Sequence, residues 1–147
     1  MPFLDACVSE TLRLYNPVQI TEREASEDYP LGNTGIVIEK GTLIHFPFHA
    51  IHHNPDFYPS PHRFDPNRFM PENRDQIIPY TYLPFGAGPR NCVGMRFALM
   101  EAKTAIVRIV KKFKFVRSEN TKVPLKFNKM KKFLQATDVT VGVEIRE

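Results

Sequence analysis

Apolar positions follow a helical period in two parts of the chain. Residues 2–15 place apolar side chains about 3.6 positions apart after a proline that suits a first helical turn, and Asn16-Pro17 ends the segment. Residues 93–112 carry a broader apolar stripe with charged residues opposite, which predicts the strongest helix of the chain. We expect this second stripe to be core; its members are Val93, Phe97, Met100, Ile106, Val107 and Val110.

The remaining segments predict short strands and one long irregular stretch. Apolar runs at 36–38 and 43–46 are bounded by turn residues, and the tail favours strands near 114–117, 123–127 and 139–145. Most of the thirteen prolines fall between 47 and 92, where periodicity is weak, and long loops of this kind are often functional. The chain is therefore interpreted as α+β, in five segments: helix 1–16, strands 17–46, loop 47–92, helix 93–112 and strands 113–147.

Composition narrows the class of protein. A hydrophobic content of 42% with 12% aromatics is enough for a packed core and excludes a disordered chain. The net charge of +4 comes mainly from late lysines and arginines, which we interpret as a solvated surface, and no nucleic-acid motif accompanies them. Two cysteines exclude a disulfide scaffold, and neither a membrane-crossing apolar run nor a signal peptide is present.

Cys92 stands at the entrance of the second predicted helix. A helix N-terminus carries partial positive charge and unpaired N–H groups, which favour a thiolate. Glycines at 86, 88 and 94 remove side chains where backbone would approach a flat cofactor. Arg90 supplies a planar fork suited to a carboxylate. The segment is therefore a candidate metal and cofactor site with Cys92 as the ligand.

This segment resembles the cysteine loop of the cytochrome P450 monooxygenases. That loop reads Phe, two residues, Gly, one residue, Arg, one residue, Cys, one residue, Gly. Phe85, Gly88, Arg90, Cys92 and Gly94 fill every fixed position. Residues 95–100 look most like animal drug-metabolising members of the family. The resemblance extends over nearly the whole chain and implies the C-terminal part of the mainly helical cytochrome P450 fold.

Two further motifs support the resemblance. Glu10 and Arg13 look like the Glu-x-x-Arg signature of the family, and residues three apart share one face of a helix. Arg68 lies in a segment that resembles the family's downstream arginine box, although Asn67 stands where glutamate is common. The resemblance implies a structural role for Glu10, Arg13 and Arg68. Without it, a Glu–Arg pair is a surface pair of small energetic value.

The resemblance implies haem b (iron protoporphyrin IX) as the cofactor, with Cys92 as the iron ligand and catalytic residue. It implies a monooxygenase that inserts one atom of O2 into an apolar substrate, with electrons from an NADPH-dependent reductase, at the cytoplasmic face of the endoplasmic reticulum membrane. The implied cofactor contacts are Arg23, Phe85, Gly86, Arg90, Cys92, Gly94 and Ala98. The implied substrate-pocket residues are Pro17, Val18, Gln19, Ile20, Phe133 and Leu134, the last two in a loop with Lys132.

The cysteines and histidines allow other interpretations. Cys7 is expected to be a buried small hydrophobic residue. His49, His52, His53 and Cys92 have zinc-type side chains, but their spacing matches no closed zinc site. A catalytic Cys–His pair lacks an orienting third residue and an oxyanion hole.

The pattern of motifs covers one side of a haem only. We expect a long helix with an acid–alcohol pair, and the family's N-terminal membrane anchor, to lie upstream, so that the chain is the C-terminal portion of a longer enzyme or a truncated gene product. Two alternatives stay open. The chain is an inactive remnant that binds haem weakly or not at all, or it belongs to a haem-thiolate isomerase, which needs no electron donor.

Overall fold

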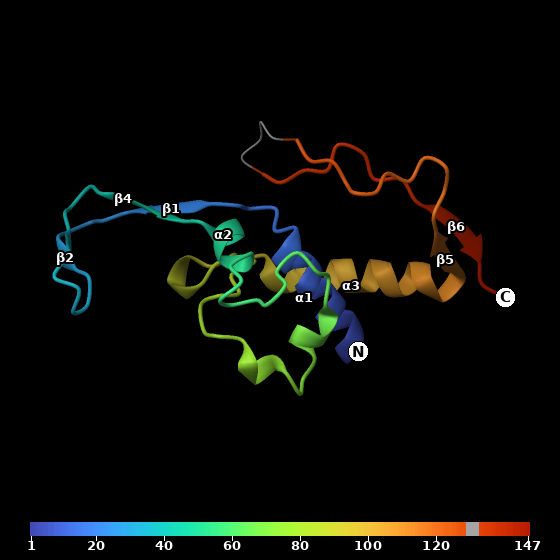
Figure 1. Ribbon diagram of the computed structural model, residues 1–147, viewed down its shortest axis with the longest axis horizontal. Helices are drawn as coiled ribbons and strands as arrows, with labels where there is room; N and C mark the ends of the chain where they lie inside the picture. Colours follow the sequence, from blue (N-terminus) through green and yellow to red (C-terminus); the bar gives the residue numbers. More distant parts are fainter. Residues whose placement is uncertain (129–132) are drawn as a thin grey trace.

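A computed structural model describes residues 1–128 and 133–147 (Figure 1). Its helices are α1 (Pro2–Leu14), α2 (Phe48–His52) and α3 (Met95–Lys112), with 3-10 turns η1 (Pro66–Phe69), η2 (Arg74–Gln76) and η3 (Gly88–Arg90). Its strands are β1 (Thr21–Glu24), β2 (Tyr29–Pro30), β3 (Val37–Ile38), β4 (Leu43–Phe46), β5 (Phe113–Val116) and β6 (Gly142–Ile145). Helices with small antiparallel sheets confirm the α+β class.

Helix α1 is the central element of the packed region. Pro2 lies in its first turn, where a proline costs no hydrogen bond. Asp5 lies in the first turn and Arg13 in the last, and the helix dipole favours each charge at that end. One face of the helix is buried and packs mainly against η1. That face carries charged side chains as well as apolar ones, namely Ala6, Val8, Glu10, Arg13 and Leu14.

The segment 21–46 forms a thin antiparallel ribbon. Strand β1 pairs with β4, and β2 pairs with β3 at the tip, which extends away from the helices in Figure 1. The expected strand at 43–46 coincides with β4, whereas β1 was not singled out within the extended region. Its sequence Thr-Glu-Arg-Glu is almost entirely exposed, so it has no alternation of apolar and polar positions to reveal it.

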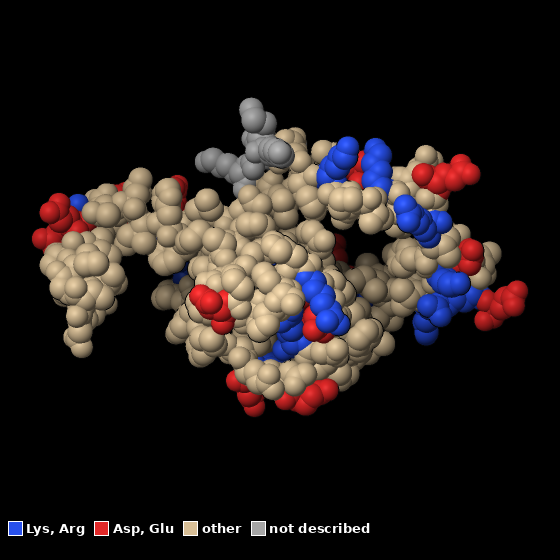
Figure 2. All heavy atoms as spheres, viewed as in Figure 1, with Lys and Arg blue, Asp and Glu red and all other residues tan. Residues whose placement is uncertain are grey.

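The tail contains one regular strand pair. Strands β5 and β6 are antiparallel at the opposite end of the molecule from the β2–β3 tip. The strand expected at 123–127 is absent from the described residues, where only an isolated bridge joins Phe127 to Ala136. Figure 2 shows Lys and Arg gathered over this end among acidic side chains. Lys114 lies 3.8 Å from Glu144 and Lys122 lies 2.7 Å from Asp138, so part of the basic charge is neutralised locally.

The apolar stripe of α3 is not core in this structure, and that expectation was wrong for the described residues. None of the eighteen residues of α3 is buried. Phe97 and Met100 are 64% and 61% exposed, and Val93, which precedes the helix, is fully exposed. The physical reason is that α3 has few neighbours: it contacts β5 at its end and α1 along one side. No described helix combines the length and apolar character that crossing a bilayer requires.

The packed centre combines a small apolar cluster with buried polar groups. Ala6, Tyr58 and Phe69 form the cluster, with Met70, Ile77 and Tyr82 packed against it. Among the described residues, the largest fully buried side chains are all polar: Arg13, His52, Glu10 and Asn16. Because buried polar groups stabilise a fold only when they are hydrogen-bonded, the partners of these four residues determine how the centre holds together.

Candidate functional site

The cysteine loop folds back on itself immediately before α3. The backbone N–H of Cys92 donates to the carbonyl oxygen of Phe85 at 2.9 Å, which closes the loop. Gly86 and Gly88 adopt φ of +74° and +75°, a conformation that costs an L-residue about 1–2 kcal/mol. Cys92 is exposed, two residues before Gly94, the N-cap of α3. The loop therefore presents the thiol near the positive end of the helix.

A cavity of about 350 Å³ lies beside this thiol. That volume falls in the usual range for small-molecule sites. The cavity draws its walls from the end of α1, from β1, from α2 and from the cysteine loop. Its lining residues are Leu12, Asn16, Pro17, Val18, Thr21, Arg23, Phe48, Pro84, Phe85, Gly86, Arg90 and Cys92.

Two guanidinium groups reach this cavity from different segments. Arg23, on β1, donates to the carbonyl oxygen of Glu22 at 2.7 Å and to that of Arg90 at 3.4 Å, so the two arginines are neighbours. Both are exposed. A planar guanidinium binds a carboxylate through two parallel hydrogen bonds. The cavity thus offers a sulfur ligand, apolar walls and two carboxylate-binding groups, a donor set that fits haem with its iron and its two propionates.

The tail lies next to the residues that line the cavity, but neither Phe133 nor Leu134 lines it. The backbone N–H of Leu134 donates to the carbonyl oxygen of Pro17 at 2.9 Å, and Phe133 forms an isolated bridge with Val18. The two sequence segments that were expected to form the substrate pocket, 17–20 and 133–134, therefore lie side by side. Lys132, expected in the same loop, falls outside the described residues.

The structure does not bring every expected residue to the cavity. Gln19 and Ile20 follow Val18 but do not line it, and neither Gly94 nor Ala98 does. A Cβ on Gly94 would lie 4.0 Å from the Cys92 sulfur, so glycine leaves that side of the sulfur open. Ala98 is one turn into α3, with its N–H donating to Gly94.

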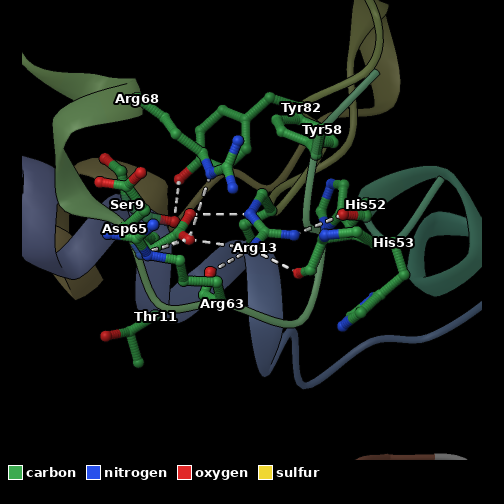
Figure 3. Close-up of polar contacts among 12 residues, drawn as sticks. Ser9, Thr11, Arg13, His52, His53, Tyr58, Arg63, Asp65, Arg68 and Tyr82 are labelled. Atoms are coloured by element: carbon green, nitrogen blue, oxygen red, sulfur yellow. Dashed lines mark hydrogen bonds and ion pairs between the residues drawn. The ribbon is translucent and has the colours of Figure 1, made fainter. Parts of the chain in front are cut away.

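Glu10 and Arg13 form a fully buried ion pair. Figure 3 shows Arg13 at the centre of a group of polar contacts. Arg13 Nε and Nη2 donate to the two Glu10 carboxylate oxygens at 2.7 and 2.8 Å, a bidentate geometry. The same guanidinium donates to the carbonyl oxygens of His52, Pro61 and Arg63 at 2.7, 2.8 and 3.4 Å. Full burial excludes the surface-pair interpretation. Arg13 instead ties the irregular loop to α1.

Arg68 joins this network from η1. Its Nε lies 3.6 Å from Glu10 Oε1, and its Nη2 donates to the carbonyl oxygens of Pro59 and Ser60 at 2.5 and 3.3 Å. The Asp65 backbone N–H donates to Glu10 Oε1 at 2.9 Å. The three charged residues singled out from the sequence thus share one cluster.

His52 is buried in the same cluster, and its ring holds the loop that leads to the cysteine. Its Nε2 accepts from the backbone N–H of Leu83 at 2.8 Å. Burial lowers the pKa of His52 to about 4, with positive charge on Arg13, His53 and His49 acting in the same direction. The Nε2 atom of His52 is therefore already used as an acceptor, and no described group of three or more His, Cys, Asp or Glu side chains is arranged to hold a metal.

The neutral His52 predicts loss of stability in mild acid. The pKa is about 4 when folded against 6.5 for the free side chain, so the unfolded state binds more protons between these values. Stability is therefore complete above about pH 6.5 and falls as the pH drops towards 4, by on the order of 3 kcal/mol. Urea unfolding at several pH values measures this slope. In His52→Gln, whose amide oxygen replaces the acceptor without titrating, the slope should become shallower; an unchanged slope would exclude His52 as its source.

Five cavity-lining residues were not proposed from the sequence as site residues: Leu12, Asn16, Thr21, Phe48 and Pro84. Asn16 served only as a helix-ending residue in the sequence analysis. It is 1% exposed, which an asparagine at a helix end does not predict. No periodicity marks these positions, because they come from four segments that meet only in the fold.

A second, larger groove of about 790 Å³ separates α1 from α3 and is almost entirely apolar. Cys7 lines it together with Val8, Ile106 and Val107. Burial raises the pKa of the Cys7 thiol, but the residue is only half-buried, so the expectation of a buried cysteine was wrong. Cys7 faces this groove and does not line the Cys92 cavity.

Comparison with known proteins confirms the resemblance. The cytochrome P450 family model matches residues 1–140. Cytochrome P450 9e2 of Blattella germanica is 48% identical over 130 residues, which are 88% of this chain and 24% of that protein. Cytochrome P450 3A19 of Capra hircus aegagrus is 48% identical over 126 residues, 86% of this chain and 57% of that protein.

Cytochrome P450 3A29 of Sus scrofa is 47% identical over 126 residues, 86% of this chain and 25% of that protein. The chain thus spans between a quarter and about half of the length of these curated relatives, which come from insects and mammals. Both the family match and the animal relatives agree with the motifs. The chain belongs to the cytochrome P450 family.

Proposed function

We propose that this chain provides the cysteine-ligand side of a haem-thiolate monooxygenase. The observation that carries the proposal is the exposed Cys92 thiol beside a cavity that also contains Arg23 and Arg90. A thiolate ligand, apolar walls and two guanidinium groups match the three chemical parts of haem b: its iron, its macrocycle and its propionates.

Each residue has a distinct part in this proposal. Cys92 would ligate the haem iron through its sulfur, with its loop closed by the hydrogen bond from the Cys92 N–H to the Phe85 carbonyl oxygen. Gly86 keeps a side chain away from the macrocycle. Arg23 and Arg90 bind the propionates. Haem bound in this way supplies activation of molecular oxygen, so that one oxygen atom enters the substrate, and a thiolate ligand favours cleavage of the O–O bond.

The substrate proposed is an apolar small molecule. Pro17, Val18 and Phe85 line the cavity, and Phe133 pairs with Val18 at its edge. Such walls exclude water and bind through apolar contact. These walls indicate an apolar class of substrate.

The electron donor proposed is an NADPH-dependent reductase that meets the basic side of α3. Arg96, Arg108, Lys111 and Lys112 are exposed along that helix. Positive charge of this kind steers an acidic partner into contact. We place the complete enzyme at the cytoplasmic face of the endoplasmic reticulum membrane, as the resemblance implies.

A second candidate is that the 147-residue chain alone binds haem weakly and turns over nothing. The exposure of Cys92, Arg23 and Arg90 favours it, because haem held by these residues alone would be in contact with water. A water-filled site weakens binding and the electrostatic control of the reaction.

The test is a titration of the chain with ferric haem, followed by reduction under carbon monoxide. We expect the red-shifted Soret band of a thiolate-ligated haem. Because binding is weak, the band should appear only when haem is in large excess over the protein. A band typical of nitrogen-ligated haem would contradict the thiolate proposal. Assay of an apolar substrate with a reductase then separates the two candidates, since turnover by the chain alone would reject the second.

A further inference from the structure

One polar side chain in the Cys92 cavity has an unused hydrogen-bond donor. Asn16 lines the cavity at the end of α1 and is 1% exposed. Its Oδ1 accepts from the Val18 backbone N–H at 3.4 Å. Its Nδ2 has no partner anywhere in residues 1–128 and 133–147. A buried amide nitrogen without a partner is costly, and native structures keep few of them.

The turn formed with Val18 fixes which end of the amide is unsatisfied. Asn16 Oδ1 accepts the hydrogen bond from the Val18 N–H, so Nδ2 is the atom without a partner. Nδ2 lies on the other branch of the amide and points away from the Val18 N–H. An isosteric leucine would fill the same space without the unsatisfied Nδ2 donor, although it would also remove the acceptor of the Val18 N–H. The asparagine therefore has a donor for which the described residues provide no acceptor.

The charge of the cavity indicates the class of acceptor. Arg23 and Arg90 line the same cavity, and Asp and Glu side chains are absent from its described lining. Donors of this kind in one cavity, two charged and one neutral, suit an anion with several acceptor oxygens. A carboxylate meets this requirement.

We propose that Asn16 Nδ2 donates a hydrogen bond to a carboxylate of the molecule bound in the Cys92 cavity. This inference rests on the proposed function. The carboxylate has two sources, a haem propionate or an acidic substrate, and both present the same chemistry. Asn16 is then a positioning residue that the sequence motifs do not include.

The experiment compares wild-type protein with Asn16→Leu and Asn16→Asp. Ferric haem is titrated into each ligand-free protein, and laurate is then titrated into each haem-loaded protein, both followed by Soret absorption. Loss of one hydrogen bond should weaken binding of the carboxylate partner about threefold to tenfold in Asn16→Leu. Asn16→Asp retains the acceptor for Val18 but places negative charge at the site, so its loss should be at least as large.

Thermal unfolding of the ligand-free proteins supplies an independent readout. Asn16→Leu removes the unsatisfied Nδ2 donor and also the acceptor of the Val18 N–H, so its unfolding temperature should stay close to that of wild type while it binds more weakly. A purely structural asparagine predicts the opposite: Asn16→Leu unfolds at lower temperature, and Asn16→Asp binds like wild type. Asn16→Leu alone keeps the test decisive if the aspartate variant does not fold.

The outcomes separate the sources and the hypotheses. Weaker haem binding assigns the propionate, and weaker laurate binding with unchanged haem binding assigns a substrate carboxylate. Unchanged affinity for both in the variants overturns the inference while leaving the proposed function intact. If wild-type protein itself shows no thiolate-type band, the proposed function fails, and this inference fails with it.

Discussion

Replacing Cys92 with serine is expected to abolish the thiolate-type absorption of the reduced, carbon monoxide-bound protein. Sulfur donates electron density to iron far more strongly than a serine hydroxyl, which stays protonated near neutral pH. The substitution changes one atom at an exposed position, so the fold should be retained. The measurement is the absorption spectrum after haem addition, reduction and exposure to carbon monoxide.

Cys7→Ser is the matched control for this prediction. The sequence contains two cysteines, and Cys7 lines the apolar groove between α1 and α3. Its replacement should leave the spectrum unchanged. A thiolate-type band that survives in Cys92→Ser and disappears in Cys7→Ser would reverse the ligand assignment.

Removing the guanidinium of Arg13 is expected to have the largest effect on stability. Arg13→Ala leaves the Glu10 carboxylate buried without its bidentate partner and takes the donor from three loop carbonyl groups. Breaking a buried ion pair on one side costs about 3–5 kcal/mol, because the remaining charge keeps its desolvation penalty. Urea unfolding followed by far-ultraviolet circular dichroism measures this change, and Arg13→Ala should be largely unfolded in buffer.

Lys114→Ala provides the comparison, because Lys114 pairs with Glu144 at the surface with both side chains more than half exposed. Exposed pairs contribute below about 1 kcal/mol. Similar losses for the two variants would show that the buried network has no special role. Arg13→Lys should fall between them, because an ammonium group keeps the charge but lacks the planar fork.

The residues of the buried ion-pair network were more predictable than the elements around them. Glu10, Arg13 and Arg68 were expected together because they resemble motifs of the family, which fix residue type at set intervals, and the structure brings them into one cluster. The five-residue helix α2 and the strand β1 were not expected. A helix of one turn and an exposed strand leave no periodic pattern, because neither buries a regular face.

Burial was the least predictable property. An asparagine before a proline and a histidine in a proline-rich loop ordinarily indicate exposed positions, yet Asn16 and His52 are among the most buried side chains described. Both are buried by segments distant in sequence: His52 hydrogen-bonds Leu83, and Asn16 shares its cavity with Cys92. Conversely, the apolar face of α3 predicted buried residues, but the described elements do not fully cover that face and none of its residues is buried.

The contacts of Arg13 also determine when the site can assemble during synthesis. Helix α1 leaves the ribosome before the loop that follows it, because the carbonyl groups that Arg13 binds lie 39, 48 and 50 residues further along the chain. At about 5–20 residues per second, the guanidinium waits roughly 3–10 s for its partners. During that interval the Glu10–Arg13 pair is hydrated and local, and the loop that later shapes the Cys92 cavity is still unconstrained.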